Sequence, residues 1–453
     1  MISRSRFNCK RLADYKSETP IMSKKITAGL VLLTLLGLCT GSFLPLGQAQ
    51  TGVAGTAQNA AIVSTTAAVL KETSELRELS ILKSVKSGAQ SRAEIERMII
   101  RNLDDESTPA EMHAAEMTLK AFGLAPQDFS YRPFLIKLLT EQVAGYYDPK
   151  TQQFYLADWI ELEGQKPVMA HELTHALQDQ HFDLKRFENW PKGDSDAELA
   201  VHALIEGDAT LAMTLYMAKN PMVALAFIRS LGSQELATEQ FKQAPRALRE
   251  SLLFPYEEGS AWATQLYKRG GWEMVSRAFT KLPQSSEQIL HPDKYFAYEA
   301  PQKLTLPEFK TILGPSWKRI DYDVNGEWGY YLVLDEYLKD AAESKRASAG
   351  WAGDRFALYE TSKPGEFFIA QVTAWDTQND AKEFFDAYAK RTEKRYADAK
   401  EVKNTGERIE WQTSSGLVAL EWRGSQVAIL EDVPAATNAN ALLGSIWQQR
   451  RVE

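Results

Sequence analysis

Val168-Met169-Ala170-His171-Glu172-Leu173-Thr174-His175-Ala176-Leu177 is the stretch that decides the fold, because it is uncharged apart from Glu172 and its histidines and carries an H-E-x-x-H pattern. No proline interrupts it, and this density of apolar residues indicates a buried helix. On a helix, residues four apart lie on one face, about 5–6 Å from each other, so His171 and His175 can point at one ion. Glu172 lies beside the first histidine, where it can take a proton from water on that ion. The pattern therefore predicts a hydrolytic zinc site.

A third protein ligand is needed in a catalytic zinc site, and two residues compete for that role. Glu206 lies in a largely apolar helix expected over residues 195–219, where a carboxylate is costly unless it is paired or bound to a metal. His181 lies six residues after His175, and in a continuing helix it is rotated by about 240° and faces away. A bending glycine would bring it back, but this chain has Gln178 there. Glu206 is therefore the expected ligand, and His181 is the alternative.

A glutamate helix about thirty residues after an H-E-x-x-H helix resembles the arrangement of the gluzincin metallopeptidases, a class of zincins. The second helix carries Glu206-Gly207-Asp208-Ala209, in which Gly207 would let the two helices approach closely. Further stretches resemble a family of uncharacterised bacterial secreted proteins of this type. They are residues 141–149, 171–183, 203–209, 287–292 and 350–355. The resemblance spans much of residues 90–380 and implies a zinc peptidase-like protein, without implying a substrate.

Neighbouring polar residues are candidates for supporting roles. Asp179 is four residues after His175 and is expected to accept the other N–H of that imidazole, with a surface position as the alternative. His202 is four residues before Glu206 and shares its face, so it could orient Glu206, donate to the transition state or be a core histidine. Asp208 is rotated by about 200° from Glu206 and is expected to be structural.

Peptide hydrolysis also needs a donor for the developing oxyanion, usually from outside the zinc helix. His291, in an expected loop before a proline, is the first candidate for this catalytic role, and Tyr146 and Tyr147 are the alternatives. A loop histidine and two half-buried tyrosines fit the same positions. Glu258 is a reserve candidate for a metal ligand.

Residues 143–157 have the pattern of a strand, a turn and a second strand. In zincins an edge strand ahead of the metal helix pairs with extended substrate, which is a form of strand addition. Residues Phe154 to Ala157 are expected to be that strand here, and a plain structural hairpin is the alternative.

Residues 1–49 are expected to be a secretory signal, or a membrane anchor if they are not cleaved. Lys24 and Lys25 precede an almost wholly apolar run over residues 26–38, and Gly47-Gln48-Ala49 offers small residues at a cleavage site. We therefore expect an exported protein, periplasmic or extracellular, with membrane anchoring as the alternative.

The cysteine content and the net charge limit which ligands and binding partners are expected. Cys9 and Cys39 both lie in the expected leader, so the exported chain would contain no disulfide and no thiolate ligand. Removing residues 1–49 takes away seven basic and two acidic residues, which moves the net charge from −8 to −13. Such an acidic chain argues against nucleic acid as a partner, and leaves a peptide or protein substrate as the expected one. Nothing in the sequence indicates the oligomeric state.

The predicted fold class is α+β, with a mainly helical zincin-like domain over residues 67–315 and a small α+β domain over residues 316–453. Residues 50–66 are of low complexity and are expected to be a linker. Helices are expected in residues 67–140, at 166–182 and 195–219, and from 221 to about 281 with breaks at Pro255 and Gly270-Gly271. In the C-terminal domain strands are expected at 356–359, 367–375, 409–412, 417–422 and 427–430, and helices at 378–395 and 436–449. Trp351 and Trp375 are expected in its core.

The sequence therefore favours an exported zinc metallopeptidase. His171, His175 and Glu206 would hold Zn²⁺, and Glu172 would activate water and pass its proton to the leaving amine. One alternative is a catalytically inactive zinc-binding periplasmic assembly or binding protein, against which an intact Glu172 argues. Another is a hydrolase that cleaves a cell-wall amide instead of a protein.

Overall fold

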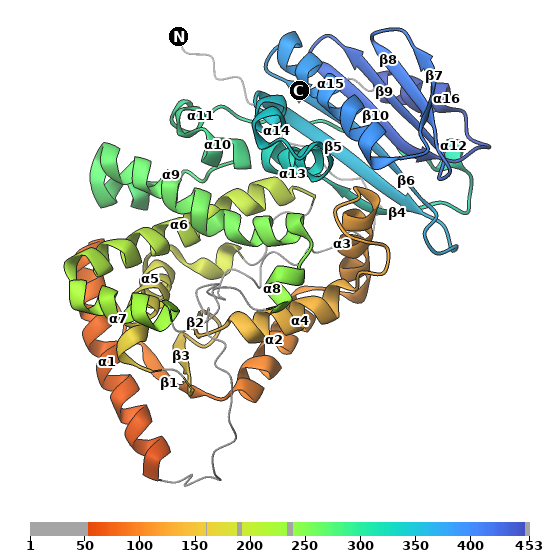
Figure 1. Ribbon diagram of the computed structural model, residues 1–453. Coiled ribbons are helices and arrows are strands. Elements are labelled where there is room, and N and C mark those ends of the chain that lie inside the picture. The colour runs from red at the N-terminus through yellow and green to blue at the C-terminus, as the bar shows by residue number, and fades with distance from the viewer. Residues whose placement is uncertain (1–52, 160, 188–192, 233–238, 449–453) are drawn as a thin grey trace, which may run out of the picture.

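The computed structural model describes residues 53–159, 161–187, 193–232 and 239–448 (Figure 1). The expected leader and both cysteines lie outside the described residues. The fold class is α+β, as predicted: helices dominate the N-terminal part, and a large sheet dominates the C-terminal part. In Figure 1 the two parts lie side by side, with the blue sheet beside the helices coloured orange to green.

The first helix corrects the expectation of a linker over residues 50–66. Helix α1 spans Val53–Arg77, and Ile62 and Thr66 are buried in it. It packs along the H-E-x-x-H helix, α5 (Lys166–Phe182), so this contact orders a segment whose composition alone resembles a linker. The helices that follow are α2 (Arg92–Glu106), α3 (Pro109–Ala121) and α4 (Tyr131–Gln142).

A three-stranded sheet, with two strands between α4 and α5 and one before α2, overturns two expectations. Its strands are β1 (Lys86–Gln90), β2 (Gly145–Asp148) and β3 (Gln153–Ala157), in the order β1-β3-β2. β1 lies where only helices were expected, and it pairs with β3 in parallel. Strand β3 is therefore central, and the prediction that Phe154 to Ala157 form a substrate-pairing edge strand is wrong. β1 shows no alternation of apolar residues, so its pairing could not be foreseen from the sequence.

Helix α6 (Ser195–Lys219) carries Glu206 and packs against α1 and α5. Helix α9 (Arg246–Ala278) packs along it and runs straight through Pro255, where a break was expected. Its kink falls at Gly270 and Gly271, the latter with φ 63°. The shorter elements are η2 (Glu163–Gln165), η3 (Leu184–Phe187), α7 (Pro221–Gly232), α8 (Glu239–Gln243), α10 (Ser286–Leu290) and α11 (Pro292–Ala297).

The C-terminal sheet is antiparallel, in the order β4-β5-β6-β10-β9-β8-β7. Its strands are β4 (Lys318–Asp323), β5 (Trp351–Glu360), β6 (Phe367–Trp375), β7 (Lys400–Asn404), β8 (Arg408–Gln412), β9 (Leu417–Arg423) and β10 (Gln426–Val433). The helices are α12 (Lys310–Leu313), α13 (Gly326–Leu338), α14 (Ala341–Ser348), α15 (Gln378–Arg395) and α16 (Ala439–Gln448). The predicted strands all occur. The two edge strands, β4 and β7, were missed; every residue of β7 is exposed, so it carries no apolar signal.

Both faces of this sheet are covered, and strand β5 shows how. Phe356 and Leu358 pack with α13, α14 and α15 on one face, whereas Ala357 and Tyr359 face α12 and α16 on the other. This is the alternation expected of a strand buried on both sides. Trp351 and Trp375 join the first face and are 1% exposed, which confirms that they are core residues.

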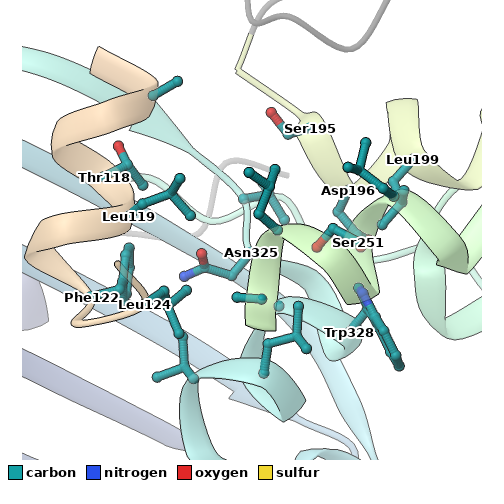
Figure 2. A pocket seen from close by; sticks show the side chains of 18 of the residues that line it. Thr118, Leu119, Phe122, Leu124, Ser195, Asp196, Leu199, Ser251, Asn325 and Trp328 are labelled. Carbon is teal, nitrogen blue, oxygen red and sulfur yellow. The ribbon is translucent and has the colours of Figure 1, made fainter. Parts of the chain in front are cut away.

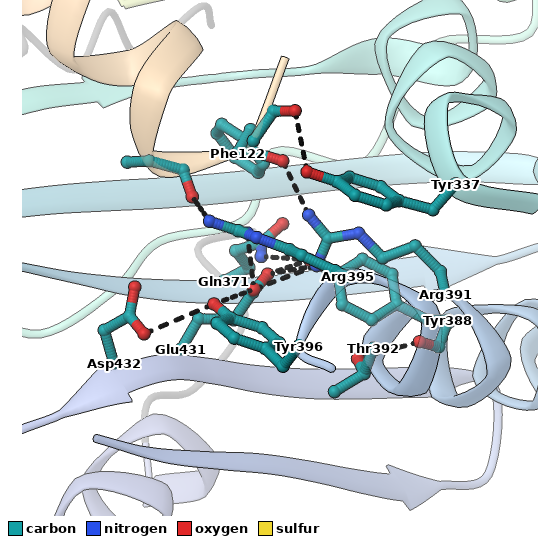
Figure 3. Close-up of polar contacts among 12 residues, drawn as sticks. Phe122, Tyr337, Gln371, Tyr388, Arg391, Thr392, Arg395, Tyr396, Glu431 and Asp432 are labelled. Atoms are coloured by element: carbon teal, nitrogen blue, oxygen red, sulfur yellow. Dashed lines mark hydrogen bonds and ion pairs between the residues drawn. The ribbon is translucent and has the colours of Figure 1, made fainter. Parts of the chain in front are cut away.

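A buried polar cluster joins the two parts of the molecule (Figure 3). The guanidinium groups of Arg391 and Arg395, on α15, donate to the carbonyls of Phe122 and Ala121, each over 2.6 Å. Both arginines pair with the buried carboxylate of Glu431 on β10. These contacts satisfy carbonyls at the C-terminal end of α3 that have no partner within the helix. The C-terminal part therefore fixes the position of α3.

No single helix in the described ranges is long and apolar enough to cross a membrane. One pair, Ser195–Lys219 with Pro221–Ser230, meets that standard only when taken together, and it is bent by 114°.

Candidate metal centre

Two buried helices bring together the three ligands that were expected from the sequence. His171 and His175 lie one turn apart on α5, and Glu206 lies on α6, which packs against it. His171 Nε2 is 3.1 Å from Glu206 Oε2 and 3.1 Å from His175 Nε2, and His175 Nε2 is 3.4 Å from Glu206 Oε2. Within the described ranges this is the one group of histidine, cysteine and acidic side chains that could hold a metal ion.

The spacing of these atoms fits a zinc ion. Ligands at zinc's usual bond lengths of about 2.0–2.2 Å lie roughly 3.3 Å from one another at the corners of a tetrahedron. The three measured separations bracket that value. The second oxygen of Glu206, Oε1, is buried without a hydrogen-bond partner among the described residues. A buried carboxylate oxygen without a partner is costly, and a bound cation would remove that cost.

The charges at the site also favour a cation. Burial alone would raise the pKa of Glu206, but His175 and His171 outweigh it and lower the pKa to about 2. Burial would likewise lower the pKa of His175, yet Glu206 and Glu172 raise it to about 9. The carboxylates therefore make this pocket a place where positive charge is stabilised.

Gln178 holds His175 in position, a role that the sequence interpretation assigned to Asp179. His175 Nδ1 lies 2.8 Å from Gln178 Oε1 and donates its N–H there, which leaves Nε2 directed at His171 and Glu206. Gln178 Nε2 donates in turn to Asp208 Oδ2, 2.9 Å away. Asp208 is buried and paired with Arg77 of α1, at 2.5 Å. A chain of contacts thus links the metal cluster to a helix nearly one hundred residues earlier.

Asp179 and His181 lie away from the cluster. The carboxylate of Asp179 accepts from the Tyr147 hydroxyl at 2.8 Å. His181 Nε2 contacts the carbonyl of Ser80 at 2.8 Å, near the end of α5. The continuing helix turns His181 away from His175, as its rotation predicts. Neither His181 nor Glu258 belongs to the metal-binding group.

Glu172 is positioned by the backbone of strand β2. Its Oε2 accepts the N–H of Tyr147 at 2.9 Å, while its Oε1 is buried without a hydrogen-bond partner in the described part of the chain. Burial raises the pKa of Glu172 to about 8. One oxygen is therefore anchored and the other is open to a proton, the arrangement that a general base requires.

His291, the first candidate for an oxyanion donor, is engaged elsewhere. Its Nε2 lies 2.9 Å from Glu327 Oε1, and its side chain is 42% exposed at the end of α10. The alternatives are engaged too: the Tyr146 hydroxyl donates to Gln90, and the Tyr147 hydroxyl donates to Asp179. All three side chains are therefore engaged with other residues.

Tyr256 on α9 is the aromatic residue that the sequence interpretation missed. Its ring stacks on that of His171, with centroids 6.1 Å apart and planes at 28°. A close helix contact places it there: a Cβ on Gly207 would lie 2.2 Å from the carbonyl oxygen of Gly259. Gly207 therefore allows α9, not α5, to approach α6. Tyr256 lies three residues before Gly259 and therefore on the same face of α9, so this spacing is the sequence feature that could have indicated its position.

A cavity of about 290 Å³ lies beside the candidate ligand Glu206, between α6, α9, α3 and α13. Glu206, His202 and Tyr256 line it. Burial lowers the pKa of His202 to about 4, so its ring is neutral, and its Nε2 has no hydrogen-bond partner among the described residues. His202 thus faces the same space as Glu206 and is not a fully satisfied core histidine.

Comparison with known proteins adds one match. Residues 313–443 match a family described as a domain of unknown function (DUF8575). The match covers the C-terminal sheet with α13, α14, α15 and part of α16, and it includes none of His171, His175 and Glu206. No curated protein matches the chain, and no solved structure matches it.

Proposed function

We propose that this protein is an exported, zinc-dependent peptidase of gluzincin type. The observation that carries the proposal is a buried group of three ligand atoms, from His171, His175 and Glu206, that lie within 4.8 Å of one another. Glu172, the residue next to His171, adds a buried carboxylate oxygen without a hydrogen-bond partner among the described residues. A site that only stabilised the fold would have no use for a base held by one oxygen and open at the other. The export part of the proposal rests on the sequence of residues 1–49 alone.

Zinc would supply a Lewis acid that polarises the peptide carbonyl and makes water a stronger acid. The other roles belong to the chain. Glu172, anchored by the N–H of Tyr147, accepts the proton of the attacking water on its open oxygen and delivers it to the leaving amine. Gln178 keeps the lone pair of His175 directed at the metal. Asp208 and Arg77 keep the amide of Gln178 from turning.

Tyr256 and His202 are the candidates for stabilising the oxyanion. Both line the cavity at the end where Glu206 lies. A tyrosine hydroxyl or a histidine N–H directed at the developing charge contributes roughly 10²–10³-fold in rate. We therefore assign this role to Tyr256, with His202 as its neighbour, in place of His291.

The test compares wild type with Glu172→Gln in zinc content and in cleavage of casein and of a mixed peptide pool. We expect both proteins to bind zinc and the variant to lose about 10²–10⁴-fold in rate, the usual contribution of a general base. Glu163→Gln is the matched control, because Glu163 precedes α5 but is 66% exposed and pairs with Lys166. It should keep full activity.

Two results would replace this proposal with another function. Wild type that binds zinc but cleaves no peptide in the pool would favour a non-enzymatic zinc-binding protein. Release of muropeptides from cell-wall sacculi by wild type, lost in Glu172→Gln and without any cleavage of peptide substrates, would favour a cell-wall amide hydrolase.

A further inference from the structure

The cavity beside the metal cluster is elongated and follows one face of α6. Asp196, Leu199, His202 and Glu206 line it at intervals of three or four residues, which places them on the same side of the helix. Ten residues of helix separate Asp196 from Glu206, or roughly 15 Å at 1.5 Å per residue. The cavity therefore extends well beyond the space that the reacting atoms of a substrate need.

Its walls are apolar and come from both parts of the molecule (Figure 2). Leu119 on α3, Leu252 on α9, and Trp328 and Val333 on α13 all line it. Figure 2 shows Leu119 and Leu124 on one side, across from Leu199 and Trp328. A space walled in this way takes an apolar group from water most favourably.

Gly329 keeps the α13 wall open. It lies in the interior of α13, where glycine weakens a helix relative to alanine, and it lines the cavity. Its φ is in the ordinary negative range, and the nearest atoms to an added Cβ belong to the side chain of Asn325, the closest at 3.1 Å. No neighbouring backbone therefore requires glycine here. What its lack of a side chain provides is room in the cavity.

The far end of the cavity is polar. Asp196 Oδ1 and Asn325 Nδ2 are buried without hydrogen-bond partners among the described residues, and both residues line the cavity. Burial raises the pKa of Asp196 well above its usual range. A long hydrocarbon chain that filled the whole cavity would leave these groups unpaired, which is costly. A side chain that ends before them does not bear that cost.

We propose that this cavity is the specificity subsite of the enzyme and takes one large apolar side chain, such as leucine, phenylalanine or tyrosine, from the residue on one side of the cleaved bond. The inference rests on the proposed peptidase function. It gives the C-terminal part of the chain a role in catalysis: α13, through Gly329 and Val333, sets the size of the subsite. α15 contributes indirectly, because its arginines fix α3 and with it Leu119.

The test uses zinc-loaded protein and peptides that differ in one residue, Ala, Leu, Phe, Trp or Asp, on either side of the cleaved bond. On one side, kcat/KM for Phe or Leu should exceed that for Ala by about 10- to 100-fold, the value of burying such a side chain. Gly329→Leu should lower the ratio of Phe to Ala at least 10-fold, because its side chain fills the cavity. Leu119→Ala enlarges the cavity and should raise Trp relative to Phe at least 3-fold.

Gly444→Leu is the matched control, since Gly444 is also a helical glycine of the C-terminal part and has nothing within 4 Å of an added Cβ. It should leave activity and preference unchanged. Cleavage without preference for apolar residues, or unchanged preference in both cavity variants, would overturn the inference while the peptidase function stands. Preferential cleavage of an N-decanoyl peptide over its Phe counterpart would also overturn it, in favour of an acyl chain.

Binding separates this inference from the proposed function. The zinc-loaded Glu172→Gln variant should bind N-acetylphenylalanine amide more tightly than N-acetylalanine amide in ligand-observed NMR, and adding Gly329→Leu should abolish the difference. If wild type cleaves no peptide but this difference is present, the peptidase proposal fails and the cavity remains a site for an apolar side chain. Equal binding of the two amides would contradict the subsite itself.

Discussion

Glu431 and Glu206 are both buried glutamates, the first paired with two arginines and the second with two histidines. They differ in how many of their oxygens have hydrogen-bond partners. Glu431 accepts hydrogen bonds on both oxygens, from Arg391, Arg395 and two tyrosines. Glu206 has one oxygen beside two imidazole nitrogens and the other without a hydrogen-bond partner in the described ranges. The first carboxylate is saturated by the protein itself. The second is arranged for something that the chain does not supply.

The difference teaches how to tell a structural ionic cluster from a functional one. Burying a charge is costly unless every lone pair is matched, so a purely structural cluster is expected to be complete. A buried cluster that leaves a polar atom without a partner is expected where a bound ligand supplies that partner. Around Glu431 the completed contacts join α15 to the end of α3, whereas Glu206 and Glu172 each keep one buried oxygen without a hydrogen-bond partner among the described residues.

The largest expected effect comes from breaking the saturated cluster. Glu431→Gln leaves Arg391 buried without its countercharge, so we expect the free energy of unfolding to fall by about 3–5 kcal/mol. Denaturant titration measures this, and zinc binding by the folded variant should be unchanged. Glu273→Gln, at an exposed pair with Arg277, should change stability by less than about 0.5 kcal/mol. A loss of zinc binding in Glu431→Gln would show that the two clusters are not separate in function.

Removing the metal should have the next largest effect. A ligand that binds only the folded state at 100 to 1,000 times its Kd stabilises it by about 2.7–4.1 kcal/mol. We expect a chelator to lower the free energy of unfolding of wild type by this amount, and to have no effect on Glu206→Gln. Thermal or denaturant unfolding with and without chelator measures it. Equal shifts in wild type and Glu206→Gln would contradict a role of Glu206 in holding the metal.

A smaller effect is expected from the contact that orients His175. Gln178→Leu is similar in size but cannot accept from Nδ1, so zinc affinity should fall by about 10–100-fold. Competition with a fluorescent chelator measures the Kd. Gln180→Leu is the control, because Gln180 lies on the same helix but contacts the backbone of Leu82 and Lys83 instead. Unchanged affinity in Gln178→Leu would remove Gln178 from the metal site.

The smallest effect concerns His291 and depends on pH. The hydrogen bond to Glu327 raises the pKa of His291, so the pair contributes stability that is fully present below the unfolded value of about 6.5 and is lost as pH rises through the folded value. The stability difference between wild type and His291→Gln should therefore shrink from pH 5 to pH 9. A difference that stays constant with pH would contradict the ion pair.

The grouping of the three candidate metal ligands could be foreseen because most of their geometry is local. The spacing of His171 and His175 places them on one face of a helix. The apolar residues before Glu206 indicate a buried carboxylate that needs a partner. The contacts of His175 could not be foreseen in the same way. Gln178 and Asp179 are both within reach in sequence, and only the packing of α6, with Asp208, selects the former.

The fold, like the candidate site, could be predicted where the pattern of residues is local. The interior strands of the C-terminal sheet carry apolar patterns and were predicted, whereas the exposed β7 was not. The predictions for two segments were wrong for the same reason. Strand β1 and helix α1 are both ordered by partners far along the chain, β3 and α5 respectively. The cavity belongs to this group, because its walls come from α3, α4, α6, α9, α13 and strand β5, which no local pattern relates.

The most direct test of the central claim is a crystal structure of zinc-soaked protein with data collected on both sides of the zinc absorption edge. We expect one anomalous peak within about 2.0–2.2 Å of His171 Nε2, His175 Nε2 and a carboxylate oxygen of Glu206. A peak liganded by His181 with Glu206 remote, or no peak at the cluster at all, would contradict the account.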